Sequence, residues 1–170
     1  AYGHTETVSL VKNTNRINLT LYASQGTTLP AAGNIDVKLT AANGSYHVDN
    51  LFADTQQVTY RPFNEPQETD GKIVYSLSTL RLVQGENVRL EVTDRTTGRS
   101  LLSSSDMDLI DYLLETLPAT MQAQEYLDRQ DTWEIELYLG SNDVFGETAY
   151  TAIMIKINGW TVWSSQSGIL

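Results

Sequence analysis

The chain alternates apolar and polar residues over several short stretches, which is the pattern of strands with one buried face. In residues 17–21, Ile and Leu at the odd positions share a face opposite Asn18 and Thr20. Residues 57–63 predict a further short strand that Pro62 ends. The same period of two recurs at Ile35, Val37 and Leu39, at Val88, Leu90 and Val92, at Trp133, Ile135, Leu137 and Leu139, and at Ile153, Ile155 and Ile157.

Turn signals separate these stretches. Asn43-Gly44 and Asn158-Gly159 favour type I′ turns, because both central residues of such a turn need a positive φ. Thr-Thr-Gly at 96–98 predicts the loop of a hairpin over residues 88–104. In residues 72–83 the apolar positions lose phase, and we expect a bulge or a break near Ser78.

One segment has the helical period instead. Its apolar residues fall on one stripe of a helix around 105–117, and Pro118 stops the element. Ser105 is expected to cap the N-terminus, with Asp108 completing a capping-box-like pair. Residues 121–131 continue either as a second helical turn or as a loop. The apolar stripe consists of Ile110, Leu113, Leu114 and Leu117.

Many short strands, frequent turns and one late helix predict the fold class. We expect a mostly β protein, a Greek-key, Ig-like antiparallel β-sandwich with one inserted helix around 105–117. The length of 170 residues and a hydrophobic share of 41% suit one domain with a real core. No internal linker or repeat is evident, so residues 1–170 are interpreted as a single β-sandwich domain.

Charge and cysteine content narrow the range of partners. The formal net charge of −10 argues against nucleic acid or an anionic membrane surface as the partner. The absence of cysteine removes disulfides, thiol nucleophiles and cysteine-ligated metal sites. The sequence starts at Ala1 without an initiator Met or an apolar signal segment, which fits a chain processed or excised from a longer precursor.

The candidates for catalysis or metal binding are few. The two histidines are His4, in the polar lead, and His47, which we expect to be solvent-exposed. Glu65, Glu68 and Asp70 lie in a polar stretch and are interpreted as solubilising charges, because a tuned acid/base pair needs burial. Asp106-Met107-Asp108 lacks the glycine and closing glutamate of a calcium loop, so helix capping is favoured. We therefore predict no catalytic residues, no metal and no cofactor.

The aromatic residues indicate binding. Trp133 lies on a patterned strand and is predicted to be core. Trp160 and Trp163 should point to opposite faces of the last strand, so at most one of them is buried and the other is a sheltered ring or a contact residue. In the polar tail that follows, Ile169 and Leu170 could plug a pocket of a partner, or the terminus could simply fray.

Several segments resemble a known family when taken in order. QEYLDRQDTWEIELYLG followed by AIMIKINGWTVW is similar to the C-terminal region of the FimB/Mfa2 family of fimbrial subunits from Bacteroidales. Upstream, LVKNTNRINLTL resembles the strand that opens the same domain, TLRLVQGENVRLEVTDRTTGRSLL its mid-domain hairpin, and SSSDMDLIDYLLE the helix after it. The resemblance runs from about residue 8 to residue 163.

The resemblance implies a transthyretin-like β-sandwich, usually the second of two such domains in a subunit of the type V pilus. It also implies an exported lipoprotein at the cell surface and outer membrane, held only through a lipid anchor on an N-terminal part that this sequence lacks. The expected partners are other pilus subunits, bound by protein–protein contact and β-strand addition at a sheet edge. The residues expected to make the contact are Trp160, Trp163, Ile169 and Leu170.

A second hypothesis keeps the same architecture. In it the domain is a glycan-binding β-sandwich module of the cell surface, with Trp160 or Trp163 as the stacking platform and Tyr138 and Tyr150 nearby. An enzyme would need a cleft with a perturbed carboxylate, which nothing in the sequence predicts.

Overall fold

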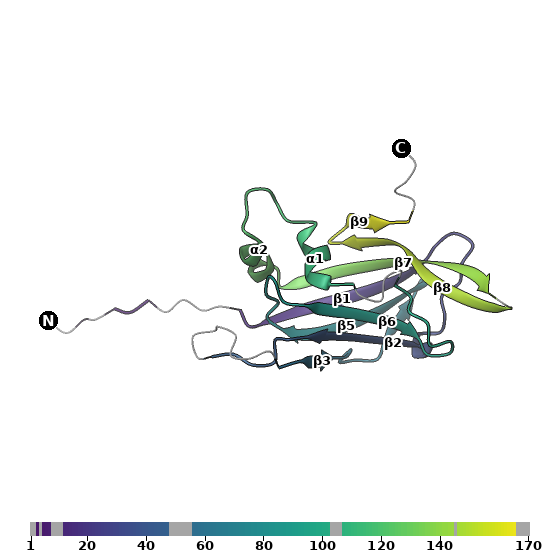
Figure 1. Ribbon diagram of the computed structural model, residues 1–170, viewed down its shortest axis with the longest axis horizontal. Coiled ribbons are helices and arrows are strands. Elements are labelled where there is room, and N and C mark those ends of the chain that lie inside the picture. Colours follow the sequence, from purple (N-terminus) through teal and green to yellow (C-terminus); the bar gives the residue numbers. More distant parts are fainter. Residues whose placement is uncertain are drawn as a thin grey trace.

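The structure, a computed structural model, describes residues 3, 5–7, 12–47, 56–102, 107–144 and 146–165. Nearly half of these residues belong to strands, and two short helices follow one another before the last three strands (Figure 1). The elements are β1 (Thr14–Ala23), a 3-10 turn (Ala32–Asn34), β2 (Ile35–Ala41), β3 (Val58–Tyr60), β4 (Gln67–Thr69), β5 (Lys72–Leu80), β6 (Val88–Asp94), α1 (Leu109–Leu114), α2 (Ala123–Arg129), β7 (Thr132–Val144), β8 (Glu147–Ile157) and β9 (Trp160–Ser164).

The strands form two sheets, which confirms the predicted mostly β class. The larger sheet has the order β4-β5-β1-β7-β8-β9 and the smaller has the order β3-β2-β6. The expectation of a purely antiparallel sandwich needs one correction, because β1 and β7 run parallel, with Arg16 opposite Thr132 and Ala23 opposite Leu139. A parallel pair needs a long crossover, and here residues 24–131 supply it. The other described strand pairs are antiparallel.

Helix α1 extends the second layer beyond β6 (Figure 1). Asp108, directly before the helix, forms an isolated bridge with Arg89 of β6. Its carboxylate accepts hydrogen bonds from the backbone N–H of Ile110 at 2.9 Å and of Val88 at 3.4 Å. The start of α1 is thereby attached to the start of β6. Residues of α1 and of β9 line the same hollow, so the helix lies over the β9 side of the larger sheet.

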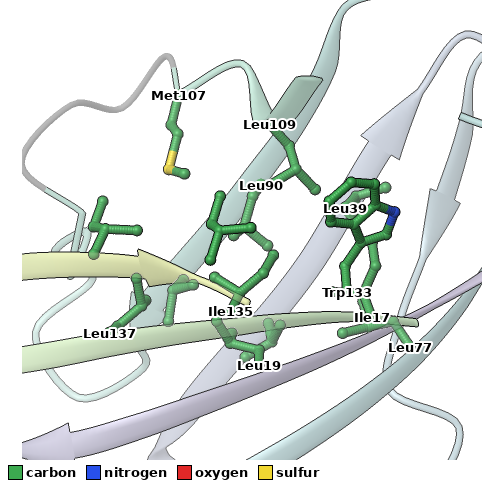
Figure 2. Packing of buried hydrophobic residues seen from close by; sticks show 14 of the residues in the cluster. Ile17, Leu19, Leu39, Leu77, Leu90, Met107, Leu109, Trp133, Ile135 and Leu137 are labelled. Atoms are coloured by element: carbon green, nitrogen blue, oxygen red, sulfur yellow. The ribbon is translucent and has the colours of Figure 1, made fainter. Parts of the chain in front are cut away.

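The core lies between the two layers. Trp133, Ile135 and Leu137 of β7 point toward Leu39 and Leu90 of the smaller sheet, as Figure 2 shows. Trp133 is fully buried, which confirms its predicted place in the core. Its ring meets that of Tyr126 from α2 edge to face, with 5.4 Å between centroids. Burial of such large apolar surfaces is the main favourable term in the stability of the domain.

The predicted break in β5 is wrong. The strand pairs with β1 without interruption, and Ser78 lies opposite Arg16 in regular register. The apolar phase fails only because Thr79, a polar residue, takes the inward position after Ile73, Tyr75 and Leu77. One polar residue at a buried position therefore does not change the register in which β5 pairs with β1.

The helical region also differs from its prediction. Helix α1 covers six residues rather than the segment 105–117, and Asp108 itself is the N-cap. Ser105 lies outside the described residues. After Leu114 the backbone tightens, because Thr116 and Leu117 donate to carbonyls three residues back, and Pro118 follows. Residues 121–131, for which the sequence allows a second helical turn or a loop, contain a second helix, α2.

The two Asn-Gly pairs have different structures. Asn158 and Gly159 have φ of 49° and 82°, so the predicted turn with two positive φ values is confirmed. Asn43-Gly44 is not such a turn, because neither residue has a positive φ. Asn43 is 1% exposed and donates to the carbonyls of Leu80 and Arg81, while its side-chain oxygen accepts from the Tyr60 hydroxyl at 2.7 Å. This asparagine joins the end of β2 to β3 and to the segment after β5.

The hairpin predicted over residues 88–104 is confirmed in its first half. β6 is regular, and Gly98 with φ of 70° forms the loop. Beyond the loop, pairing with β6 consists of an isolated bridge between Thr93 and Ser100. Leu101 then accepts a hydrogen bond from Ala152 of β8 and donates one to Val92 of β6, so the segment links the two sheets.

Helix α2 is fixed by an ion pair. The Arg81 guanidinium donates two hydrogen bonds of 2.7 Å to the Asp128 carboxylate. Burial alone would raise the pKa of Asp128, but hydrogen bonds from Arg81 and Gln124 outweigh it, so that pKa lies below its usual value. The pair holds α2 against the segment that follows β5.

Candidate partner-binding site

Four of the described strands lie at a sheet edge, and they differ in what they offer another chain. β3 and β4 have three residues each, and β4 turns directly into β5 through Asp70 and Gly71, both with positive φ. The outer edge of β6 is bridged at both ends, by Asp108 and by Ser100. β9 has five residues, and no strand within the described part of the chain pairs with its outer side. β9 is therefore the edge best suited to accept a further strand.

A tight turn fixes the position of β9. The backbone N–H of Asn158 donates to the carbonyl of Glu134 at 2.8 Å, and its side-chain oxygen accepts from the Glu134 N–H at 3.0 Å. The turn between β8 and β9 is thus attached to β7 as well. At the other end of β9, Ser165 donates to the carbonyl of Ile153 at 2.9 Å. β9 is therefore hydrogen-bonded to neighbouring strands at both of its ends.

The two tryptophans of β9 do not point to opposite faces, and that prediction is wrong. Trp160 lies opposite Ile157 and Trp163 lies opposite Ile155, with a register shift between Ile155 and Lys156. Residues directly opposite each other share a face, and both isoleucines are buried. The bulge inserts Val162 as an extra residue, which returns Trp163 to the same side as Trp160. Both rings therefore lie on the side of the sheet that α1 covers.

A second bulge lies in β8 and corrects the expected buried face there. Tyr138 lies opposite Met154, whereas Leu139 lies opposite Ala152, which leaves Ile153 as the extra residue. Ala152 and Ile155 are buried, and Ile153 is half-buried. The strict alternation predicted for residues 153–157 therefore holds only for Ile155 and Ile157.

Two hollows lie side by side between α1 and β9. The first has a volume of about 290 Å³ and the second about 280 Å³, and Glu115 and Val162 contribute to both. We call them together the edge groove. It is lined by Asp111, Tyr112, Glu115, Thr116, Leu117, Trp160, Thr161, Val162 and Trp163.

Side-chain exposure distinguishes the parts of the edge groove. Trp160 is 72% exposed, whereas Trp163 and Val162 are half-buried and pack against the core. Phe63 is the other large hydrophobic residue of the described chain that is exposed, and the Arg16 guanidinium lies 5.5 Å from its ring centroid. An indole that is mostly exposed to water beside a hollow lined by both apolar and polar residues is typical of a binding surface.

The helix side of the edge groove is acidic. Asp111 and Glu115 are four residues apart, so they lie on one face of α1 and its continuation, and both are exposed. No ion pair to either carboxylate is found among the described residues. The edge groove thus combines an apolar floor with a negatively charged rim.

The remaining residues predicted for binding lie elsewhere. Ile169 and Leu170 are outside the described residues. The Tyr138 ring stacks on Tyr22 at 4.9 Å, and Lys156 lies 5.1 Å from its centroid. Since β1 and β8 flank β7 on opposite sides, both faces of the Tyr138 ring are covered, and no face is left for a sugar. Tyr150 is half-buried in a separate hollow beside Pro30 and Asp94.

The candidates for catalysis are dispersed. His47, Glu65, Glu68 and Asp70 are all exposed, while His4 and Asp106 lie outside the described residues. The residues that the structure describes contain no group of three or more His, Asp or Glu side chains that could hold a metal ion. In a hollow of about 370 Å³, Asp36 accepts hydrogen bonds from Arg61 and Arg95, so these three charged side chains are paired with one another. In the described part of the chain, no helix has the length and apolar character needed to cross a bilayer.

The structure resembles bacterial adhesin-like β-rich proteins. A putative adhesin from Bacteroides thetaiotaomicron superposes with a TM-score of 0.72 and 28% identity, over 89% of this chain and 52% of that one. The fimbrial anchor protein Mfa2 from Porphyromonas gingivalis superposes with a TM-score of 0.69 and 25% identity, over 89% of this chain and 49% of that one. The fold is therefore that of the adhesin-like β-rich proteins of these bacteria.

The sequence defines the family. The sequence profile of the Mfa2 family, described as fimbrillin-A associated anchor proteins Mfa1 and Mfa2, matches residues 1–166. The minor fimbrium anchoring subunit Mfa2 of Porphyromonas gingivalis is 28% identical over 163 residues, which are 96% of this chain and 46% of that protein. The chain belongs to the Mfa2 family, as its segments indicated, and it spans about half the length of the curated relative that it matches.

Proposed function

We propose that this chain is one β-sandwich domain of a fimbrial subunit or anchor component, and that it works by protein–protein contact with other pilus subunits. The proposal rests on family membership together with one structural observation. That observation is the unpaired outer side of β9 beside the exposed Trp160, within the described residues. A partner would add an extended segment to this edge.

The geometry of the edge suits strand addition. Backbone hydrogen bonds to β9 give affinity, while every second side chain of the added strand enters the edge groove and sets the register. Ile157 and Trp160 flank a two-residue loop and form its hydrogen-bonded pair, so the N–H of Thr161 points away from β8. This outward N–H is available to a partner's carbonyl.

The wider setting follows from the family. We propose that the chain is the C-terminal domain of a two-domain protein, since it spans 46% of its curated relative. In this proposal the whole protein is exported to the cell surface, where it is part of a fimbrium and attaches to the outer membrane through a lipid anchor outside this sequence. The acidic net charge of −10 suits a protein partner better than nucleic acid.

A proline at position 161 tests strand addition. Proline removes the outward N–H and is tolerated at the solvent side of an edge strand, so Thr161→Pro should leave the fold intact and abolish binding to pilus subunits purified from the source organism. Thr161→Val keeps the N–H and serves as the matched control. Near-ultraviolet circular dichroism checks the fold, and surface plasmon resonance measures binding. Equal binding by a folded Thr161→Pro variant would refute strand addition at β9.

A glycan-binding module is the alternative, and one observation favours it. The exposed Trp160 ring lies beside the hydroxyl group of Thr161 and the carboxylate of Glu115, and such a set can stack on and hydrogen-bond a sugar. Titration with soluble glycans tests this, because a bound sugar would quench Trp160 fluorescence. Quenching that disappears in Trp160→Phe would support the module, and unchanged fluorescence with every glycan would exclude it.

A further inference from the structure

We propose that the edge groove selects a partner strand in which a Lys or Arg side chain follows an apolar one on the same face, and that it rejects a second copy of this chain. The inference rests on the proposed strand addition at β9 and names the chemistry of the partner. It is based on the apolar floor, the acidic rim and the unpaired edge, which all lie within one short stretch of surface.

The two hollows differ in the partner side chain that each could receive. The first is lined by Leu117, Trp160 and Val162 together with Glu115, Thr116 and Thr161. A branched aliphatic side chain could contact its three apolar residues. The second is formed by Tyr112, Val162 and Trp163 beneath Asp111 and Glu115. An aromatic wall under two carboxylates suits the apolar stem of a Lys or Arg, whose charged end then reaches the rim.

The two hollows follow one another along β9. Trp160 and Trp163 line successive hollows on one side of β9, and consecutive side chains on one face of a paired strand lie two residues apart. A segment added to the outer side of β9 therefore places one side chain in each hollow. The register that puts its apolar residue beside Leu117 puts its next inward residue beside Glu115.

The acidic rim is open to a cation. Glu115 lines both hollows and Asp111 the second, and within the described residues neither carboxylate has a cationic partner. On α2, by contrast, Glu125 is paired with Arg129 four residues later. A basic side chain from a partner would supply the missing positive charge, so charge complementarity joins main-chain pairing in selecting the partner.

The same charges oppose self-association. Two copies paired through β9 about a two-fold axis would place their α1 helices on the same side of the joined sheet. The four carboxylates of the two rims would then face one another, between molecules that each carry a net charge of −10. The carboxylates thus attract a basic strand and repel a second copy of the chain. Attraction of one partner together with repulsion of another is a common source of specificity.

A displayed library of twelve-residue peptides, randomised at every position, tests the inference with the 170-residue chain as bait. We expect the enriched peptides to carry Lys or Arg two residues from a Val, Ile or Leu, and not to bind Thr161→Pro. On Asp111→Asn/Glu115→Gln the preference for the basic residue should vanish, and a selected peptide should bind about threefold more weakly at low salt, as for an exposed ion pair. Glu65→Gln/Glu68→Gln, at the opposite end of the sheet, is the control with the same change in net charge.

The outcomes separate the inference from the proposed function. Enriched peptides without a basic residue, or with the same basic preference on Asp111→Asn/Glu115→Gln, would overturn the inference while leaving strand addition in place. A failure to enrich any peptide that depends on position 161 would overturn both. Sedimentation velocity adds an independent check, because a β9-dependent dimer of the wild-type chain would contradict the exclusion of a second copy.

Discussion

Trp133 and Trp160 are the same residue type on strands of one sheet, and their surroundings are opposite. Trp133 lies on β7, near the middle of the sheet, is fully buried and meets Tyr126 edge to face. Trp160 lies on β9, at the edge, and is 72% exposed. The ring of Trp133 packs against other residues of the core, whereas no strand among the described residues pairs with the outer side of β9, where Trp160 lies. The interior around Trp133 thus maintains the fold, and the β9 edge around Trp160 is available for contact.

The largest effect is expected from Trp133→Ala. Removal of the indole leaves a cavity between β7 and α2, and we expect a loss of about 3–5 kcal/mol in the free energy of unfolding. Urea denaturation followed by far-ultraviolet circular dichroism measures it. Trp133→Phe keeps an aromatic ring and should be milder. If Trp133→Ala were as stable as wild type, the distinction between interior and edge would fail.

Asn43→Ala should have the next largest effect. It removes the hydrogen bonds of this side chain with the Tyr60 hydroxyl and with the carbonyls of Leu80 and Arg81, of which the Arg81 carbonyl keeps a side-chain donor, from Tyr46, and we expect a loss of about 2–3 kcal/mol. The matched change is Asn158→Gly in the exposed Asn-Gly turn, where a positive φ suits glycine and the loss should be about 0.5–1 kcal/mol. The same urea titrations compare the two. Similar losses at both sites would show that burial of Asn43 contributes nothing.

The Arg81–Asp128 ion pair gives a pH-dependent prediction. The pKa of Asp128 is lower in the folded chain than in the unfolded chain, where it is 3.8. The stabilisation that the ion pair gives is therefore fully present above pH 3.8 and is lost as the pH falls through the pKa of the folded chain. We expect Asp128→Asn to lower stability at pH 7 by about 1–2 kcal/mol, and the difference from wild type to shrink below about pH 4. Thermal unfolding between pH 3 and pH 7 measures this difference. A difference that stays constant over the whole range would argue against the ion pair.

The smallest effect on stability is expected from Trp160→Ala. An exposed ring contributes little to the core, so the free energy of unfolding should change by less than about 0.5 kcal/mol. Binding to pilus subunits should nevertheless be lost, since exposed tryptophans are frequent hot spots. Trp163→Ala, which removes a half-buried ring, should reduce both the free energy of unfolding and the binding. Retention of full binding by Trp160→Ala would show that this ring is not part of the contact.

The fold class could be predicted because the alternation of apolar residues is directly visible in the sequence. In β2 the odd-numbered residues are buried and the even-numbered ones half-buried. In β6 the even-numbered residues are buried, and the alternation is apolar up to the last of them, Asp94. The parallel pairing of β1 and β7 could not be predicted, since alternation gives the buried face of a strand and not its neighbour. The two Asn-Gly pairs show a similar limit: the same dipeptide forms a turn at 158 and a buried junction at 43.

The candidate site could be predicted only in part. Trp160 and Trp163 were identified from their position on the last strand, but the bulge that brings them to one face has no signal in the sequence. The helix residues that complete the edge groove, Tyr112 and Glu115 among them, come from a distant segment and were missed. The i, i+4 spacing of Asp111 and Glu115 was a visible signal of a shared face, although not of its contact with β9.

The central position of β1 determines when the protein can fold. Its partner β7 is synthesised late: Asn18 and Glu134, which are hydrogen-bonded across the two strands, are 116 residues apart in the sequence. A nascent chain that stops before residue 132 has β1 with one side unoccupied, and pairings of such separation form slowly. The middle of the sheet therefore closes only after β7 has been synthesised, and until then the preceding segments remain accessible to a chaperone.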